Sequence, residues 1–161
     1  NLSEDEIIVN VQGDEPFIEI EVVEAVINRV KQIKENNEDI MITSCYKEIS
    51  SSLADDPNHV KVVLDEHSNA IYFSRAKVPY HRDHHEDATY SGHLGIYGFT
   101  KKSLNAFCEL KSSKLENIEK LEQLRAIDNG HKIAMVKVIS KSFGIDTQAD
   151  LDNAIRIFSK K

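Results

Sequence analysis

Apolar residues change from one spacing to another along the chain, and these changes predict the order of strands and helices. Residues 7–11 form a β-branched run without polar alternation, which is typical of a strand buried on both faces. Apolar residues then recur at helical spacing, at Ile20, Val23, Ile27, Val30 and Ile33. A further strand is expected at 40–45. This β-α-β order predicts two parallel strands joined by a right-handed crossover.

Short strands separated by polar segments are predicted in the middle of the chain. Residues 60–64 and 70–74 flank the polar turn 65–69, and this arrangement predicts a hairpin. Residues 81–92 are polar and rich in histidine, which indicates a loop before another strand at 94–99.

Helices dominate the last third of the chain. Ser113 and Glu116 have the spacing of a capping box, and Gly130 is placed to end the helix that they open. The predicted elements are, in order, a helix at 102–110, a helix from 114 to about 128, a strand at 133–138 and a last helix that follows a second cap at 147–150. The whole pattern predicts an α/β fold with a mixed sheet.

Composition narrows the class of protein. Of 161 residues, 40% are hydrophobic and 29% are charged, which fits one compact domain. No apolar run approaches the roughly 18 residues that span a bilayer, and no secretion leader is evident. We therefore expect a cytoplasmic protein with Cys45 and Cys108 as buried thiols.

Net charge bears on the kind of ligand. The value of −7 argues against a surface that coats nucleic acid, because such a surface needs basic residues. A single nucleotide can still bind an acidic site when a divalent cation bridges carboxylate and phosphate.

The loop after the first predicted strand is the first candidate site. Ligands of open α/β sheets bind beyond the carboxyl ends of strands, where Asp14 lies. Gly13 allows close approach of a ligand to the backbone. Asp14 is therefore either a metal ligand or substrate contact, or part of an ordinary turn in which Asp14 or Glu15 caps a helix.

Two further acidic residues are candidates. Glu122 shares a face of the predicted helix with Arg125, so it either forms an ion pair with Arg125 or contacts a polar ligand. Asp146 precedes a predicted N-cap, so it either complements the helix dipole or supplies a second carboxylate to the cation of Asp14.

Basic residues give the remaining candidates. The spacing of His81 and His85 suits zinc on a helix, but the loop-like composition around them and His84 favours exposed imidazoles. His93 follows Gly92 at the start of a strand and could point into a site. Arg75, close to Lys77, either grips a carboxylate or belongs to a surface charge pair.

Several of these segments together resemble one family. The segment Asn10–Pro16 is similar to the signature of the 3-deoxy-D-manno-octulosonate (Kdo) cytidylyltransferases, also called CMP-Kdo synthetases. Further similar segments follow in the same order, at 60–64, 72–76, 93–98, 121–125 and 144–147. The resemblance covers almost the whole chain.

The resemblance implies a Rossmann-like nucleotidyltransferase fold, a homodimer and a magnesium-dependent transfer of CMP from CTP to the sugar acid, with release of pyrophosphate. It implies that Asp14 and Asp146 act in catalysis by holding Mg²⁺. It also implies a substrate-binding set made of Gln12, Arg75, His93, Tyr97, Glu122 and Gln123. Residues 60–99 would supply much of the dimer contact and part of the sugar site.

The chain departs from the family pattern at its start. Chains of this family begin with a strand and a glycine-rich, basic loop that wraps the CTP phosphates, and nothing here matches that part. We therefore expect residues 1–161 to be a single partial domain that carries mainly the sugar side of the site. The alternatives are a cytidylyltransferase for another sugar acid, such as a sialic acid, and a non-catalytic fragment for sugar-acid binding or dimerisation.

Overall fold

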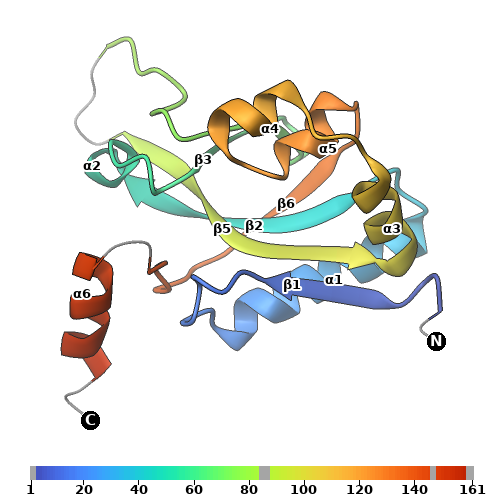
Figure 1. The fold of residues 1–161 in the computed structure, drawn as a ribbon, viewed down its shortest axis with the longest axis horizontal. Helices are drawn as coiled ribbons and strands as arrows, with labels where there is room; N and C mark the ends of the chain where they lie inside the picture. The colour runs from blue at the N-terminus through green and yellow to red at the C-terminus, as the bar shows by residue number, and fades with distance from the viewer. Residues whose placement is uncertain (1–2, 84–87, 146–147, 159–161) are drawn as a thin grey trace.

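A mixed sheet of six strands organises the computed structural model, which describes residues 3–83, 88–145 and 148–158 (Figure 1). The strands are β1 (Ile7–Val11), β2 (Ile42–Ser50), β3 (Lys61–Leu64), β4 (Ala70–Ser74), β5 (Thr89–Thr100) and β6 (Ile133–Lys137). The helices are α1 (Ile20–Asn36), α2 (Ser51–Ala54), α3 (Lys101–Glu109), α4 (Lys114–Glu119), α5 (Leu124–Asp128) and α6 (Gln148–Phe158). The predicted α/β class with a mixed sheet is confirmed.

The long strand β5 lies at the centre of the sheet. It pairs antiparallel with β1 and β2, and at Gly92 with β3. Strands β3 and β4 form the predicted hairpin, and β6 pairs parallel with β2. Because β1 and β2 both run opposite to β5, they point the same way, as predicted, but β5 separates them.

Helix α1 covers one face of the sheet (Figure 1). Its helical spacing places Val22 and Val26 in a core with Cys45, Leu94 and Ile96. A Cβ atom at Gly98 would lie only 2.4 Å from Val26 Cγ1, so a glycine in β5 allows the helix to approach closely.

Helices α3, α4 and α5 lie on the opposite side of the sheet from α1 (Figure 1). The core on this face contains Phe73, Tyr97, Phe99, Leu121 and Leu124. Alternate residues of β5 point to the two faces, which places Leu94 and Ile96 against α1 and Tyr97 and Phe99 against the other helices.

Three predictions of local structure were wrong. Residues 89–92 are not loop, because they pair with the end of β2 and extend β5. The helix predicted at 114–128 is two helices, because Lys120 adopts a left-handed conformation with φ of 55°. Cys45 is buried as expected, but Cys108 lies on the exposed side of α3.

None of the helices in the described part of the chain has the length and apolar character to cross a membrane.

Candidate active site

One pocket beyond the end of β1 contains every predicted site residue that the structure describes. These residues come from the loop after β1, the end of β4, strand β5 and the turn between α4 and α5, and they are Gln12, Asp14, Arg75, His93, Tyr97, Glu122 and Gln123. The eighth predicted residue, Asp146, lies outside the described residues, as do His84 and His85. The fold thus brings together side chains that are up to 111 positions apart, from Gln12 to Gln123.

The loop after β1 is held against β5 by one main-chain hydrogen bond and one from the main chain to a carboxylate. Gln12 N–H donates to the Gly95 carbonyl at 2.9 Å, and Gly95 N–H donates to Glu15 Oε1 at 3.2 Å. A Cβ atom at Gly95 would lie 3.0 Å from Gln12 Oε1, so the glycine leaves room for the Gln12 side chain close to the strand. Helix α1 begins after Glu19, which is its N-cap, so the interpretation of Asp14 or Glu15 as helix caps was wrong. The Asp14 side chain is exposed at the pocket.

Ser44 determines the tautomer of His93. The Ser44 hydroxyl lies 2.7 Å from the Ile96 carbonyl, to which it donates its one hydrogen, and 2.9 Å from His93 Nε2. The hydroxyl must then accept a hydrogen from Nε2, so the network assigns Nδ1 as an acceptor. Burial lowers the pKa of His93 to about 3, and the ring is therefore neutral near pH 7. A neutral acceptor in this pocket suits a hydroxyl group of a ligand.

Gln123 presents an unused donor beside Tyr97. The Tyr97 hydroxyl donates to Gln123 Oε1 at 3.2 Å, while Gln123 Nε2 is buried without a hydrogen-bond partner among the described residues. An unpaired buried amide costs about 1–3 kcal/mol, which a ligand acceptor would recover. Burial raises the pKa of Tyr97, so its hydroxyl keeps its proton and remains a donor.

Arg75 leaves the end of β4 with its guanidinium on backbone carbonyls. Its Nε donates to the Glu119 carbonyl at 2.9 Å and its Nη1 to the Pro57 carbonyl at 3.1 Å. Lys77, in contrast, forms the surface ion pair, with its Nζ 2.9 Å from Asp55 Oδ1. Two of the five N–H donors of the guanidinium are used by these carbonyls, and the other three have no partner among the residues that the structure describes.

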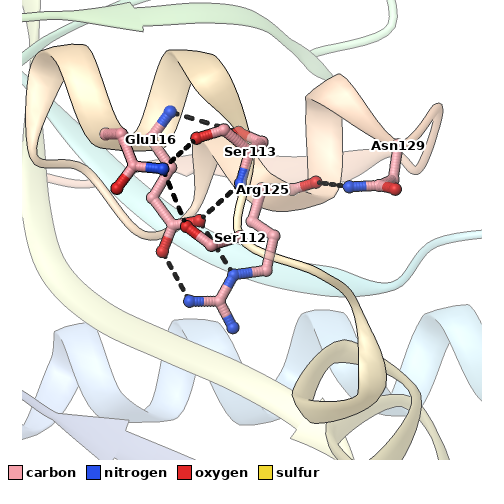
Figure 2. A network of polar contacts seen from close by, with 6 residues as sticks. Ser112, Ser113, Glu116, Arg125 and Asn129 are labelled. Atoms are coloured by element: carbon pink, nitrogen blue, oxygen red, sulfur yellow. Dashed lines mark hydrogen bonds and ion pairs between the residues drawn. The ribbon is translucent and has the colours of Figure 1, made fainter.

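The end of helix α4 at Lys120 places Glu122 and Gln123 in a turn beside the pocket. Ser113 and Glu116 form the predicted capping box of α4, and the Glu116 carboxylate pairs with Arg125 at 2.5 Å (Figure 2). Of the two alternatives for Glu122, the ion pair with Arg125 is wrong, because Arg125 pairs with Glu116 instead. Glu122 lies in the turn that lines the pocket.

The segment before residue 146 is fixed beside Asp14. Ile145 N–H donates to the Asp14 carbonyl at 2.8 Å. Glu19 Oε1 accepts from Lys141 N–H at 2.8 Å, and Lys47 Nζ donates to the Ser142 carbonyl. Burial lowers the pKa of Lys47, although the charges of Glu15 and Glu19 oppose this effect.

Three important residues were missed by reasoning from the sequence. Ser44 occurs in a predicted strand, Lys47 just beyond that strand, and Glu119 in a predicted helix. Their roles depend on partners that are 49, 95 and 45 positions away, at His93, Ser142 and Ser74. Spacing within one element gives no signal for such contacts.

Comparison with known proteins identifies the family. A family model described as Cytidylyltransferase matches residues 1–133. The chain belongs to the cytidylyltransferase family.

Curated relatives agree with this assignment. A 3-deoxy-manno-octulosonate cytidylyltransferase of Wolinella succinogenes is 52% identical over 155 residues, which are 95% of this chain and 64% of that protein. One from Helicobacter pylori strain 26695 is 50% identical over an alignment of 161 residues, which covers 98% of this chain and 64% of that protein. The chain thus spans a little under two thirds of the length of these relatives.

Solved structures support the same fold. The structure of a CMP:2-keto-3-deoxy-manno-octonic acid synthetase complexed with CTP matches with a TM-score of 0.82 and 33% identity, over 96% of this chain and 62% of that chain. A glucose-1-phosphate thymidylyltransferase of Bacillus anthracis matches with a TM-score of 0.51 at 17% identity, which concerns the fold alone. The expected nucleotidyltransferase fold is confirmed.

The described residues of this cytidylyltransferase fit a magnesium ion in part. Mg²⁺ prefers oxygen ligands and is commonly held by one or two carboxylates together with substrate phosphates. Asp14 offers one exposed carboxylate at the pocket, whereas Glu15 Oε1 is occupied by Gly95 N–H. Among the described residues, no group of three acidic, histidine or cysteine side chains could hold a metal. The fit is therefore to an ion that takes further ligands from substrate.

Proposed function

We propose that the full-length protein transfers CMP from CTP to Kdo and releases pyrophosphate. The observation that carries this proposal is the collection of Arg75, His93 and Gln123 in one pocket of a chain that is 52% identical to a 3-deoxy-manno-octulosonate cytidylyltransferase. A solved relative is complexed with CTP. The described pocket is assigned to the sugar side of the reaction, because Arg75, His93 and Gln123 offer it the contacts that a sugar acid needs.

The pocket suits an acidic sugar. Three N–H groups of Arg75 have no partner in the described part of the chain and can bind a carboxylate, which an arginine can do in a bidentate manner. His93 Nδ1 can accept a hydrogen from a sugar hydroxyl, and Gln123 Nε2 can donate one to a sugar oxygen. Gln12, Tyr97 and Glu122 line the same pocket and would complete the contacts.

The reaction needs no covalent enzyme intermediate. The anomeric hydroxyl oxygen of Kdo attacks the α-phosphorus of CTP, the bond from that phosphorus to the β-phosphate bridging oxygen breaks, and pyrophosphate leaves. The hydroxyl proton is lost to solvent or to a nearby acceptor. The protein contributes by holding the sugar in a fixed orientation, which removes much of the entropy cost of the encounter.

Magnesium is part of this proposal. Asp14 would hold the ion from the protein side, and Asp146 is the second ligand that the family resemblance implies. When bound, the ion would offset the negative charge of triphosphate and sugar acid and favour ionisation of the attacking hydroxyl. The contact from Ile145 N–H to the Asp14 carbonyl supports this pairing, because Ile145 precedes Asp146 in the chain.

Three wider properties are also proposals. CMP-Kdo would serve lipopolysaccharide biosynthesis. The protein would act in the cytoplasm as a homodimer, with residues 60–99 supplying much of the contact between subunits. Exposed apolar side chains in this segment, Ile71 and Tyr80, are consistent with such a contact.

Pyrophosphate release tests the function. Full-length protein with CTP, Kdo and Mg²⁺ should release pyrophosphate, and omission of any one of the three should stop it. Replacing Kdo by a sialic acid distinguishes the two kinds of sugar-acid cytidylyltransferase. Binding of Kdo without turnover in the presence of CTP and Mg²⁺ would contradict the proposal and favour a non-catalytic binding protein.

A further inference from the structure

A fully buried lysine lies behind the pocket. Lys61 in β3 has 0% of its surface exposed, and its Nζ donates to the Arg75 carbonyl at 2.7 Å and to the Asp56 carbonyl at 3.1 Å. Burial lowers the pKa of Lys61, while the charges of Asp56 and Glu119 oppose this effect. Burying an ammonium group is costly unless its hydrogen bonds and charge are satisfied. Such a cost suggests that Lys61 has a specific task.

Glu119 holds the same strand end from the other side. Its Oε1 accepts from Ser74 Oγ at 2.7 Å and from the Tyr72 hydroxyl at 3.4 Å, and its Oε2 accepts from Arg75 N–H at 3.0 Å. The main chain of Arg75 is thus bound at both polar groups, its N–H by the Glu119 carboxylate and its carbonyl by the Lys61 ammonium.

The guanidinium of Arg75 is held by the same structure. Its Nε donates to the main-chain carbonyl of Glu119 at 2.9 Å. Glu119 therefore makes two kinds of contact with Arg75. Its carboxylate binds the Arg75 main chain, and its main-chain carbonyl binds the Arg75 guanidinium. Lys120, the next residue, turns the chain with φ of 55° toward Gln123 in the pocket. Glu119 accordingly joins two segments that line the pocket, the end of β4 and the turn after α4.

We infer that Lys61 and Glu119 are positioning residues that fix the Arg75 guanidinium relative to Gln123, so that the pocket selects a ligand with a carboxylate. This inference rests on the proposed function for the identity of the ligand. The pocket also contains Asp14, Glu15 and Glu122. A movable arginine could turn toward these acids, whereas a fixed one keeps the donors that have no partner among the described residues for substrate.

The test is a double-mutant cycle in the full-length protein. Glu119→Gln keeps the shape of the side chain but removes the charge that binds Ser74 and Arg75. We expect the KM for Kdo to rise about tenfold and the KM for CTP to stay within about twofold, since only contacts to the sugar weaken. In an Arg75→Ala background, Glu119→Gln should add little further loss of Kdo affinity.

Other outcomes would overturn the inference. Equal rises of both KM values, or additive effects of Glu119→Gln and Arg75→Ala, would mean that Glu119 supports the fold only. Glu24→Gln is the control, because it removes the same charge at an exposed position of α1. It should leave both KM values unchanged. If Glu119→Gln fails to fold, Ser74→Ala removes one donor to the same carboxylate and should raise the KM for Kdo alone.

Calorimetric titration with Kdo separates the two proposals. Wild-type protein that does not bind Kdo would contradict the proposed function and the inference with it. Wild-type protein that binds Kdo, together with a folded Glu119→Gln variant of unchanged affinity, would contradict only the positioning role. Lys61→Met gives an independent second measurement, because it removes the donor to the Arg75 carbonyl and retains an apolar chain of similar length. It should weaken Kdo binding in the same direction.

Discussion

The Ser44 hydroxyl lies 2.9 Å from His93 Nε2 and donates its own hydrogen elsewhere, to Ile96. Ser44→Ala should therefore leave the Nε2 hydrogen of His93 unpaired and release the ring from one tautomer. We expect the affinity for Kdo to fall about three- to tenfold, in line with the loss of roughly 1 kcal/mol for one hydrogen bond. Nitrogen NMR of the His93 ring would detect the tautomer, and substrate titration would measure the affinity.

Thr43→Val provides the matched control for Ser44→Ala. The Thr43 hydroxyl is also buried in β2, but it has no hydrogen-bond partner among the residues that the structure describes. Its replacement by a methyl group should keep or slightly raise the free energy of unfolding and leave substrate affinity unchanged. Loss of Kdo affinity in Thr43→Val comparable with that in Ser44→Ala would contradict the role given to Ser44.

The pH dependence of the reaction should lack a contribution from His93 near neutrality. Burial lowers the pKa of this ring to about 3, so it binds no proton between pH 5 and 8 in the folded protein. In the unfolded chain the ring titrates near its ordinary pKa of about 6.5. His93 therefore lowers the free energy of unfolding as pH falls from about 6.5 toward 3. A ring resonance of His93 that titrates near pH 6.5 in the native state would contradict this.

Glu116 should make the protein sensitive to acid. Hydrogen bonds from Arg125 lower the pKa of Glu116 to about 2, from an ordinary value of 4.5. The stabilisation is complete above about pH 4.5 and is lost as pH falls toward 2. Glu116→Gln should cost about 1–3 kcal/mol at pH 7 and flatten the acid part of the stability curve. Urea unfolding at several pH values would measure both effects, and parallel curves for the two proteins would be inconsistent with this prediction.

Gly98 should tolerate no side chain. A Cβ atom there would lie 2.4 Å from Val26 Cγ1 and 2.9 Å from Val30 Cγ2. Gly98→Ala should therefore push α1 away from β5 and lower the free energy of unfolding by about 1–3 kcal/mol. Gly13→Ala is the control, because a Cβ atom at Gly13 meets nothing within 4 Å. Thermal unfolding of the two variants would compare them, and equal melting temperatures would argue against the packing explanation.

Magnesium binding can be tested through Asp14. Asp14→Asn keeps the size of the side chain, and the Asp14 main chain still accepts the contact from Ile145. We expect turnover to fall about 100-fold or more, because a bound metal contributes several kcal/mol of charge stabilisation in the transition state, with an unchanged melting temperature. Raising the Mg²⁺ concentration should restore part of the activity. Substantial activity at ordinary Mg²⁺ concentration would refute the role of Asp14 as a metal ligand.

Local signals in the sequence predicted most of the fold. The helical spacing of α1, the capping box at Ser113 and the hairpin of β3 and β4 each depend on residues close in the chain. The break at Lys120 was not predictable in this way, because lysine is a good helix former. Burial of Leu121 and Leu124 in the core accompanies the left-handed turn, so tertiary packing overrides local preference here.

The candidate site, like the fold, could be predicted from the sequence only in part. The resemblance to a family named seven of the residues that line the pocket, whereas the roles of Ser44, Lys47 and Glu119 were found only from the structure. Each of these three acts on a residue far away in the chain: Ser44 acts across strands, Glu119 between a helix and a strand, and Lys47 between β2 and the segment after β6. Such contacts need the register of β2 with β5 and the place of α4 over β4, which local patterns do not determine.

Because His93 and Tyr97 belong to the strand that pairs with β1, β2 and β3, local opening cannot expose the pocket wall without loss of most of the sheet. Amide protons of β5 should consequently exchange with solvent only through global unfolding. A bound substrate would then slow their exchange by the full factor by which it stabilises the native state. Exchange rates of this one strand would report ligand occupancy without any assay of turnover.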